Sequence, residues 1–307
     1  MTSEAIEKFI EQATPLEVAG IPDLESFPAW RVEFDKVLGA GCPLASDIAS
    51  RKGSLGGVRG MWFEPPEQLD HAVVLYLHGG GYMTSSPTGH AGMIGEVARA
   101  TKRPTFAVDY RLAPENKFPA QRDDAIAAYR ALLDKGFGGD QIVVVGDSAG
   151  GGLALVLAMA VRDLGLPRPL GVVMVSPWTD LSNSGESNTA IADPVFASDV
   201  LVKMAEFVAG DTDLRNPELS PLYGDFKGLP PLLFMAGEVE ALRDDTVRAG
   251  RRAEEAGLDV TTLVLPGLVH VWPWFVPGAP ESAQAHATIA QWVDERMAAW
   301  ALWTQRR

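Results

Sequence analysis

The residues with the clearest chemical pattern are those at 146–150, whose sequence Gly-Asp-Ser-Ala-Gly matches G-x-S-x-G. An apolar run precedes them and a run of small residues follows, which is the strand–turn–helix context that this motif requires. At such a turn Ser148 projects from the chain beside the free N–H groups and the positive dipole of the helix. The context favours a serine nucleophile over a glycine-rich turn with a capping serine. A dinucleotide-binding loop does not fit, because Ser148 stands where that pattern needs its second glycine.

A second glycine-rich segment, His-Gly-Gly-Gly-Tyr at 78–82, follows the preceding apolar run. Glycines allow a close backbone approach and let several N–H groups point to one place, which is what a developing oxyanion needs. The alternative is a flexible or phosphate-cradling loop, but no Lys-Ser/Thr pair follows as in a P-loop. We therefore expect this segment to supply oxyanion donors, with His78 and Gly79 supporting the loop.

A serine nucleophile needs a base, and the chain has five histidines. His71 enters an apolar run and His286 lies in a predicted helix, so both are interpreted as structural or solvated. His78 belongs to the glycine-rich loop, and His90 has no supporting context. His270 follows an apolar run and a Pro-Gly turn, and it comes after the serine, as the hydrolase order of serine, acid and histidine requires. His270 is therefore the predicted base.

The third member of such a triad is a carboxylate between the serine and the histidine, at the end of a strand. The run at 232–236 leads into a segment with four candidates, namely Glu238, Glu240, Asp244 and Asp245. Acidic residues are also favoured at the start of a helix, which accounts for some of the four. Local chemistry leaves the choice open.

Short apolar runs that alternate with longer helical stretches must position these residues. This alternation is typical of a parallel sheet with crossover helices, and runs that are apolar on both faces indicate helices on both sides of the sheet. Strands are predicted at 73–77, 105–109, 142–145, 171–175, 232–236 and 260–265. Helices are predicted at 121–134, 149–161, 242–256 and 281–303, with Gly257 as the C′ residue of the third.

Two segments do not fit the alternation. Residues 1–45 are helix-like before the first strand, and residues 181–228 hold polar loops and a helix-like piece near 200–209. We expect them to form a discontinuous helical cap over the carboxyl ends of the strands, where open α/β sheets bind ligands. The catalytic domain then comprises residues 46–180 and 229–307, with a mostly parallel central sheet flanked by helices.

Composition excludes several other classes of function. The 307 residues include 26 Lys and Arg against 40 Asp and Glu, a net charge of −14, which disfavours nucleic acid and anionic membranes as partners. The single cysteine, Cys42, rules out an intramolecular disulfide and a multi-cysteine metal site, and is interpreted as a small buried residue. The N-terminus lacks a signal-peptide pattern and no apolar run is long enough to span a membrane, so we expect a cytoplasmic protein.

Taken together, the chain resembles bacterial carboxylesterases of the hormone-sensitive-lipase-like family, which have the α/β-hydrolase fold. The resemblance covers nearly the whole chain. It is carried by the segments at 78–81, 109–115 (Asp-Tyr-Arg-Leu-Ala-Pro-Glu), 118–120 (Phe-Pro-Ala), 146–150 and 176–178 (Ser-Pro-Trp).

The resemblance implies several roles that local chemistry does not settle. It implies that the N–H groups of Gly80, Gly81 and Ala149 form the oxyanion hole. The family places its acid in a G-x-x-D-x-L-x-D pattern, which aligns with residues 237–244, so that Glu240 takes the place of the usual aspartate. Family members are often dimers, so the resemblance implies a homodimer, and it implies no metal and no cofactor.

The expected function is that of a serine carboxylesterase acting on short-to-medium acyl esters through an acyl-enzyme. Alternatives are a related amidase or lactonase, since fold and triad do not determine the substrate, and a non-catalytic small-molecule receptor, which the presence of a complete triad disfavours. The predicted pocket walls are Tyr82, Met83, Trp178, Phe196 and Trp272, with Trp274 and Phe275 as further candidates.

Overall fold

The centre of the molecule is an eight-stranded sheet. The computed structural model describes residues 2–23, 25–69 and 72–304, and within them the strand order is β1-β2-β4-β3-β5-β6-β7-β8. All pairs from β4 to β8 are parallel, whereas β1 with β2 and β2 with β4 are antiparallel. This is the mostly parallel α/β sheet that the sequence predicts.

The six predicted strands are all present. The four central ones are completely buried, because helices cover both faces of the sheet. The strands are β3 (Val73–Leu77), β4 (Thr105–Val108), β5 (Ile142–Asp147), β6 (Gly171–Val175), β7 (Leu232–Val239) and β8 (Val260–Val269).

The sequence pattern did not reveal one hairpin and one helix. β1 (Ala49–Leu55) and β2 (Val58–Glu64) form a hairpin at the edge of the sheet, and α3 (Ala91–Thr101) connects β3 to β4. Most of β1 is exposed and its sequence includes Arg51, Lys52 and Gly53. An edge strand of this kind lacks the apolar run that reveals a buried strand.

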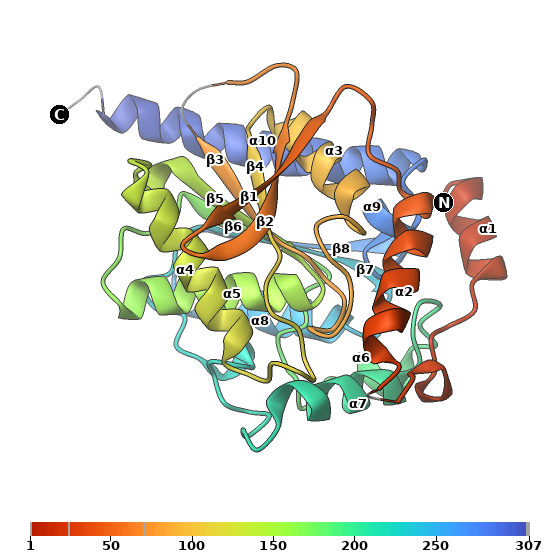
Figure 1. Ribbon diagram of the computed structural model, residues 1–307. Helices are drawn as coiled ribbons and strands as arrows, with labels where there is room; N and C mark the ends of the chain where they lie inside the picture. The colour runs from red at the N-terminus through yellow and green to blue at the C-terminus, as the bar shows by residue number, and fades with distance from the viewer. Residues whose placement is uncertain (1, 24, 70–71, 305–307) are drawn as a thin grey trace.

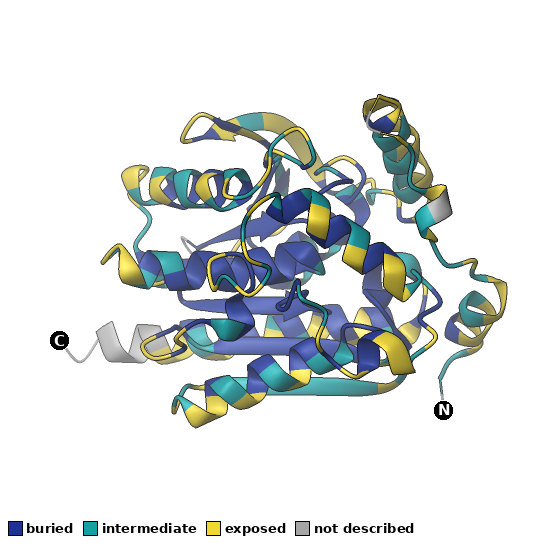
Figure 2. Ribbon diagram, turned by 90° about the horizontal axis from the view of Figure 1, so that it is seen from below, coloured by how far each residue is buried: buried dark blue, intermediate teal, exposed yellow. Residues whose placement is uncertain are grey.

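Helices cover the two faces of the sheet in two groups (Figure 1). One group contains α3 and the long α10 (Pro280–Thr304), together with the short α9 (Trp272–Phe275). The other contains α4 (Ala120–Asp134), α5 (Ala149–Asp163) and α8 (Arg243–Glu255), of which α5 is the most buried. In Figure 2 the strands of the sheet are mostly buried, whereas the outer helices expose part of their surface. The four helices predicted in the catalytic domain are confirmed, and Gly257, with φ of 74°, follows α8 as expected.

Segments 1–45 and 181–228 lie at the margin of this arrangement, at the right and bottom of Figure 1. Leu16 forms a parallel bridge with Phe196, and its N–H and C=O bond Val195 and Ala197 at 2.9 and 2.8 Å, so the two segments are joined to each other. Their elements are α1 (Glu4–Gln12), η1 (Val18–Gly20), α2 (Phe27–Gly41), α6 (Ser187–Ala190), α7 (Ser198–Ala209) and η3 (Pro221–Tyr223).

A helix that spans a membrane must be both long and apolar. Among the helices of residues 2–23, 25–69 and 72–304, none combines these two properties.

Candidate active site

Chemically active side chains follow five neighbouring strands at one edge of the sheet. His78 follows β3, Ser148 follows β5, Ser176 follows β6, Glu240 follows β7 and His270 follows β8. Because these strands are parallel, their carboxyl ends lie at the same edge, which is where open α/β sheets bind ligands. The topology therefore gathers residues that are up to 192 positions apart in the chain (270 − 78).

The turn that carries Ser148 has a strained backbone. Ser148 has φ of 52° and ψ of −124°, a conformation that few residues other than glycine adopt. A Cβ on Gly150 would lie 2.1 Å from the carbonyl oxygen of Leu77, so only glycine fits the approach of this helix to β3. The Ser148 N–H donates to the carbonyl of Val175, and its carbonyl accepts from Trp178, both at 2.9 Å. These bonds hold the serine at the start of α5.

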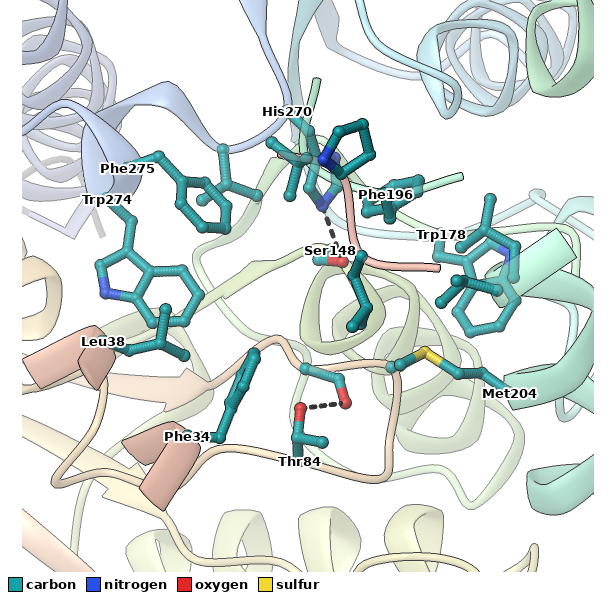
Figure 3. A pocket seen from close by; sticks show the side chains of 18 of the residues that line it. Phe34, Leu38, Thr84, Ser148, Trp178, Phe196, Met204, His270, Trp274 and Phe275 are labelled. Atoms are coloured by element: carbon teal, nitrogen blue, oxygen red, sulfur yellow. Dashed lines mark hydrogen bonds between the residues drawn. The ribbon is translucent and has the colours of Figure 1, made fainter. Parts of the chain in front are cut away.

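Ser148, His270 and Glu240 form a continuous array. The Oγ atom of Ser148 lies 3.0 Å from Nε2 of His270, the contact drawn in Figure 3. On the other side of the ring, Nδ1 lies 3.5 Å from Oε1 of Glu240. Neither of these two atoms has another hydrogen-bond partner among the described residues, and both are buried. Glu240 and His270 therefore face each other as the acid and base of a triad do.

The carboxylate of Glu240 is held in place through its second oxygen. Oε2 accepts hydrogen bonds from the hydroxyl of Ser176 and from the backbone N–H of Gly237, both at 2.8 Å. The Ser176 oxygen in turn accepts from the N–H of Val271 at 3.0 Å. Ser176 thus links the acid to the peptide that follows His270. In the sequence Ser176 stood out only as part of the Ser-Pro-Trp motif, and no local signal indicated this role.

The electrostatic environment favours a protonatable imidazole at His270. Burial by itself lowers the pKa of a histidine, but the hydrogen bond and charge of Glu240, with a further contribution from Asp193, raise the pKa of His270 above its usual 6.5. Asp193 accepts hydrogen bonds from the N–H groups of Ala241 and Val195, each at 2.8 Å. Burial raises the pKa of Asp193 itself. Asp193 lies in segment 181–228, and no sequence pattern singled it out.

The other three acidic candidates point elsewhere. Glu238 is exposed and accepts from the N–H of Gly267 at 3.0 Å. Asp244 accepts from the N–H of Ser187 at 3.0 Å, and Asp245 is bonded to the backbone at positions 179 and 180. Of the four carboxylates that local chemistry left open, the fold brings Glu240 to His270.

The glycine-rich loop lies beside the serine. Gly80 and Gly81 line the same cavity as Ser148, and Gly80 has φ of 102°, which glycine alone adopts readily. No hydrogen bond within the described residues uses the N–H of Gly80, Gly81 or Ala149. These three donors are therefore available to a ligand.

His78 supports the start of this loop. Its Nδ1 atom lies 2.7 Å from the carbonyl oxygen of Gly79, and its ring stacks on Tyr110 with 4.3 Å between centroids. The Tyr110 hydroxyl donates to the His78 carbonyl at 2.6 Å. Burial lowers the pKa of His78 to about 3, so the ring is neutral at physiological pH.

A cavity of about 560 Å³ opens above Ser148, and its walls are mainly apolar (Figure 3). Trp178 and Phe196, predicted from the sequence, and the further candidates Trp274 and Phe275 are among its lining residues. The rest of the apolar wall comes largely from segments 1–45 and 181–228. It includes Pro15, Leu16, Phe34, Leu38, Val195, Val200, Leu201 and Met204.

Three predicted wall residues do not line this cavity. Tyr82, Met83 and Trp272 are buried in the core instead. Trp272 belongs to the cluster between the sheet and α10, where its indole N–H donates to the carbonyl of Glu281 at 3.2 Å. Tyr82 and Met83 belong to the cluster on the opposite face. These residues neighbour the glycine-rich loop or His270 in the sequence, but a side chain can pack on either side of the backbone, so proximity in sequence did not decide its direction.

The remaining histidines differ in their surroundings. His286 is buried on α10, and burial lowers its pKa to about 4, so it is neutral rather than solvated. His71 lies outside the described residues. His90 has no supporting context in the sequence, but it is fully buried and bonded on both sides to Ser85 and Asp147.

Metal ligands and reactive thiols are the other chemistry that the described residues could hold. Within residues 2–23, 25–69 and 72–304, no group of three or more His, Cys, Asp or Glu side chains has the arrangement of a metal site. Cys42 is buried, as expected, and burial raises the pKa of its thiol to about 11. This thiol is therefore protonated and unreactive at neutral pH.

Comparison with known proteins places this geometry among esterases. A family model for the alpha/beta hydrolase fold matches residues 74–273. The acetyl-hydrolase of Streptomyces hygroscopicus is 40% identical over 234 residues, which are 76% of this chain and 78% of that protein. The ethyl acetate hydrolase of Pseudomonas putida is 34% identical over 221 residues, covering 68% and 69% of the two chains. The crystal structure of an esterase from the bacterial hormone-sensitive lipase family superposes with a TM-score of 0.88 and 37% identity over 97% of this chain and 99% of that one.

Proposed function

The chain belongs to the bacterial hormone-sensitive-lipase family of the α/β-hydrolase fold and is a carboxylesterase, and we propose that it cleaves short-to-medium acyl esters through an acyl-enzyme on Ser148. The observation that carries this proposal is the 3.0 Å contact between Ser148 Oγ and His270 Nε2 at the floor of the apolar cavity, with Glu240 facing the other ring nitrogen.

The first half of the reaction forms the acyl-enzyme. His270 takes the hydroxyl proton of Ser148 while Oγ attacks the ester carbonyl carbon, and the negative charge of Glu240 stabilises the resulting imidazolium. The carbonyl oxygen becomes an oxyanion that accepts hydrogen bonds from the N–H groups of Gly80, Gly81 and Ala149. His270 then gives its proton to the alkoxide oxygen, the C–O bond breaks, and the alcohol leaves.

The second half restores the enzyme. His270 takes a proton from a water molecule, whose oxygen attacks the acyl carbon bound to Ser148. The second oxyanion meets the same three N–H groups. When it collapses, the bond to Oγ breaks, His270 returns the proton to Ser148, and the carboxylic acid leaves.

Three features support small uncharged esters as substrates. The cavity of about 560 Å³ falls in the ordinary range for small-molecule sites. Its described lining holds no lysine or arginine, and its ionisable members are Glu17, Asp147 and His270, so a substrate with a free carboxylate finds no cationic partner. Two relatives are named for the hydrolysis of acetyl groups and of ethyl acetate.

We also propose that residues 1–45 and 181–228 act together as the cap of this enzyme. Support comes from the bridge between Leu16 and Phe196 and from the contribution of both segments to the cavity wall. A homodimer and a cytoplasmic location remain predictions from the sequence and its resemblance. Light scattering on the purified chain tests the dimer, and fractionation of cells that express it tests the location.

Labelling with a fluorophosphonate and peptide mass spectrometry test the nucleophile directly. The label is expected on Ser148, and a label elsewhere contradicts the assignment. Activity is then measured on p-nitrophenyl esters of increasing acyl length and on matched anilides and lactones, with Ser148→Ala as the blank. Turnover that peaks at short-to-medium chains and is absent for anilides and lactones supports the proposal. A preference for chains beyond about a dozen carbons, or faster cleavage of anilides or lactones, contradicts it.

A further inference from the structure

A second array of serine, histidine and aspartate lies buried beside the active site. The hydroxyl oxygen of Ser85 lies 2.5 Å from Nδ1 of His90, and Nε2 of His90 lies 3.2 Å from Oδ2 of Asp147. All three residues are shielded from solvent, and the His90 ring stacks on Trp274 with 3.7 Å between centroids. The array is therefore fixed by packing as well as by hydrogen bonds.

This array is not a second nucleophilic site. A carboxylate only accepts hydrogen bonds, so Nε2 of His90 carries the proton that bonds Asp147. The other ring nitrogen, Nδ1, bonds the hydroxyl group of Ser85. Ser85 does not line the cavity. No substrate carbonyl reaches its oxygen, so the array has a structural task.

The array connects the glycine-rich loop at 79–85, here called the oxyanion loop, to the turn that carries Ser148 at two points. Asp147, the residue before Ser148, accepts through Oδ1 from the N–H of Gly79 at 3.2 Å and from the Tyr76 hydroxyl at 2.8 Å. Gly79 immediately precedes the oxyanion donors, and Ser85 lies at the far end of the same loop with φ of 70°. Gly79 bonds Asp147 directly and Ser85 is linked to it through His90, so both ends of the segment 79–85 are connected to one carboxylate.

The ionisation of Asp147 is consistent with this arrangement. Burial alone raises the pKa of a carboxyl group, but the charge and hydrogen bond of His90 and the hydrogen bond of Tyr76 outweigh it and lower the pKa of Asp147. The carboxylate is thus charged at neutral pH. A charged acceptor holds backbone N–H groups more strongly than a neutral one.

We propose that Ser85 and His90 are positioning residues for ester hydrolysis, which orient Asp147 so that the N–H groups of Gly80 and Gly81 stand ready for the oxyanion. Oxyanion stabilisation depends on donors that are already in place when the charge develops, and loss of one such donor costs about 10²–10³ in kcat. The inference rests on the proposed function, in which these glycines contact the oxyanion.

Two substitutions of His90 separate its two hydrogen bonds. In His90→Gln the amide nitrogen lies about where Nε2 lay, so this variant keeps the bond to Asp147. In His90→Asn the shorter side chain reaches only to the place of Nδ1, so this variant keeps the bond to Ser85 and loses the one to Asp147. His90→Asn is therefore expected to lower kcat by about tenfold or more, with little change in KM, and His90→Gln to lower it less. His286→Asn is the matched control, because it alters another buried histidine, on α10.

A transition-state analogue distinguishes positioning from simple destabilisation. A trifluoromethyl ketone forms an oxyanion on Ser148, so its inhibition constant is expected to rise in parallel with the loss of kcat in His90→Asn, while a non-covalent ester analogue binds as before. Ser85→Ala leaves the bond between His90 and Asp147 in place and is expected to lower kcat less than His90→Asn does. Melting temperatures are recorded for every variant.

The outcomes separate the positioning role from the proposed function. Unchanged kcat and ketone affinity in His90→Asn, or losses confined to the melting temperature, overturn the positioning role. If His90→Asn does not fold, Ser85→Ala decides in the same way, since an unchanged kcat overturns the role and a reduced kcat supports it. Retention of activity by Ser148→Ala instead overturns the proposed function.

Discussion

Replacing Glu240 with glutamine removes the negative charge that faces His270 and keeps the size of the side chain. Ser176 and Gly237 still have an amide oxygen to bond, so the substitution is expected to change the chemistry more than the fold. The charge matters most when His270 holds the proton of Ser148, because the imidazolium then forms an ion pair with the carboxylate.

The separation of 3.5 Å between Glu240 Oε1 and His270 Nδ1 sets the size of the effect. With an effective dielectric constant of about 20, two unit charges at this separation attract by about 5 kcal/mol. If the transition state holds the full charge and the ground state none, kcat falls by about 10³–10⁴. This agrees with the loss of about 10⁴ known for the corresponding change in another serine triad.

The assay is hydrolysis of p-nitrophenyl butyrate as a function of pH. His270 must be neutral to accept the proton, so kcat/KM falls as the pH drops through its pKa, and the wild-type acid limb is expected above pH 6.5. In Glu240→Gln the effect of burial, which lowers the pKa, is no longer opposed by the carboxylate. The acid limb therefore moves to lower pH while the plateau falls.

Glu238→Gln and Asp244→Asn are the matched controls, because both remove a nearby carboxylate that does not face His270. Each is expected to keep kcat within about threefold of the wild type. The reasoning fails if Glu240→Gln keeps more than about a tenth of the wild-type kcat, or if either control loses as much as Glu240→Gln.

Three further substitutions probe the loop, the cavity and a buried acid. Gly80→Ala places a methyl group 2.4 Å from the carbonyl oxygen of Thr84, at a backbone φ of 102° that alanine rarely adopts. With p-nitrophenyl butyrate kcat is therefore expected to fall by about 10² or more, and a near-wild-type kcat contradicts this. Met204→Trp narrows the cavity and is expected to lower kcat/KM for hexanoate more than for acetate; equal losses contradict it. Burial raises the pKa of Asp245 from its usual 3.8 to about 8 in the folded protein. Between these two pH values the folded state holds a proton that the unfolded state has released, so the free energy of unfolding falls as the pH rises from 3.8 to about 8. Asp245→Asn is expected to reduce this fall in urea unfolding at pH 5 and 8.5, and an unchanged pH dependence contradicts it.

Motifs with fixed local spacing could be interpreted from the sequence alone. The turn around Ser148 needs small residues on both sides of the serine, because adjacent elements approach it closely. The carbonyl oxygen of Leu77, for example, leaves no room for a Cβ on Gly150. His270 could be identified because the order of serine, acid and histidine follows from the order of the strands. The buried strands were equally clear because helices on both faces demand continuous apolar runs.

The choice of acid depends on geometry that local sequence does not contain. A register shift between Gly237 and Val239 interrupts the pairing of β7 with β8 just before Glu240. This irregularity and the turn after it direct Glu240 towards His270 and leave Glu238 exposed. Charge and spacing are similar for both residues, so only the family resemblance distinguished them before the structure did.

The dependence on tertiary structure also explains why the sequence did not predict most of the cavity wall. Phe34, Leu38 and Met204 enter the cavity from segments far from Ser148 in the chain, and no periodicity marks them as a shared wall. Tyr82 and Met83 lie in the oxyanion loop, but their side chains pack into the core. Side-chain direction at irregular loops is set by tertiary packing, which the sequence pattern does not record.

Asp147 shows how a motif position that looks variable acquires a defined task. In G-x-S-x-G it occupies the first unspecified place, yet its carboxylate accepts hydrogen bonds from Tyr76 on β3, from Gly79 just after β3 and from His90 at the start of α3. A smaller or apolar residue there fits the turn but leaves these donors, all buried, without an acceptor, and each unsatisfied donor costs about 1–3 kcal/mol. The strain at Ser148 is sustained by such surrounding bonds, so the nucleophile and the oxyanion loop depend on one carboxylate for their relative placement.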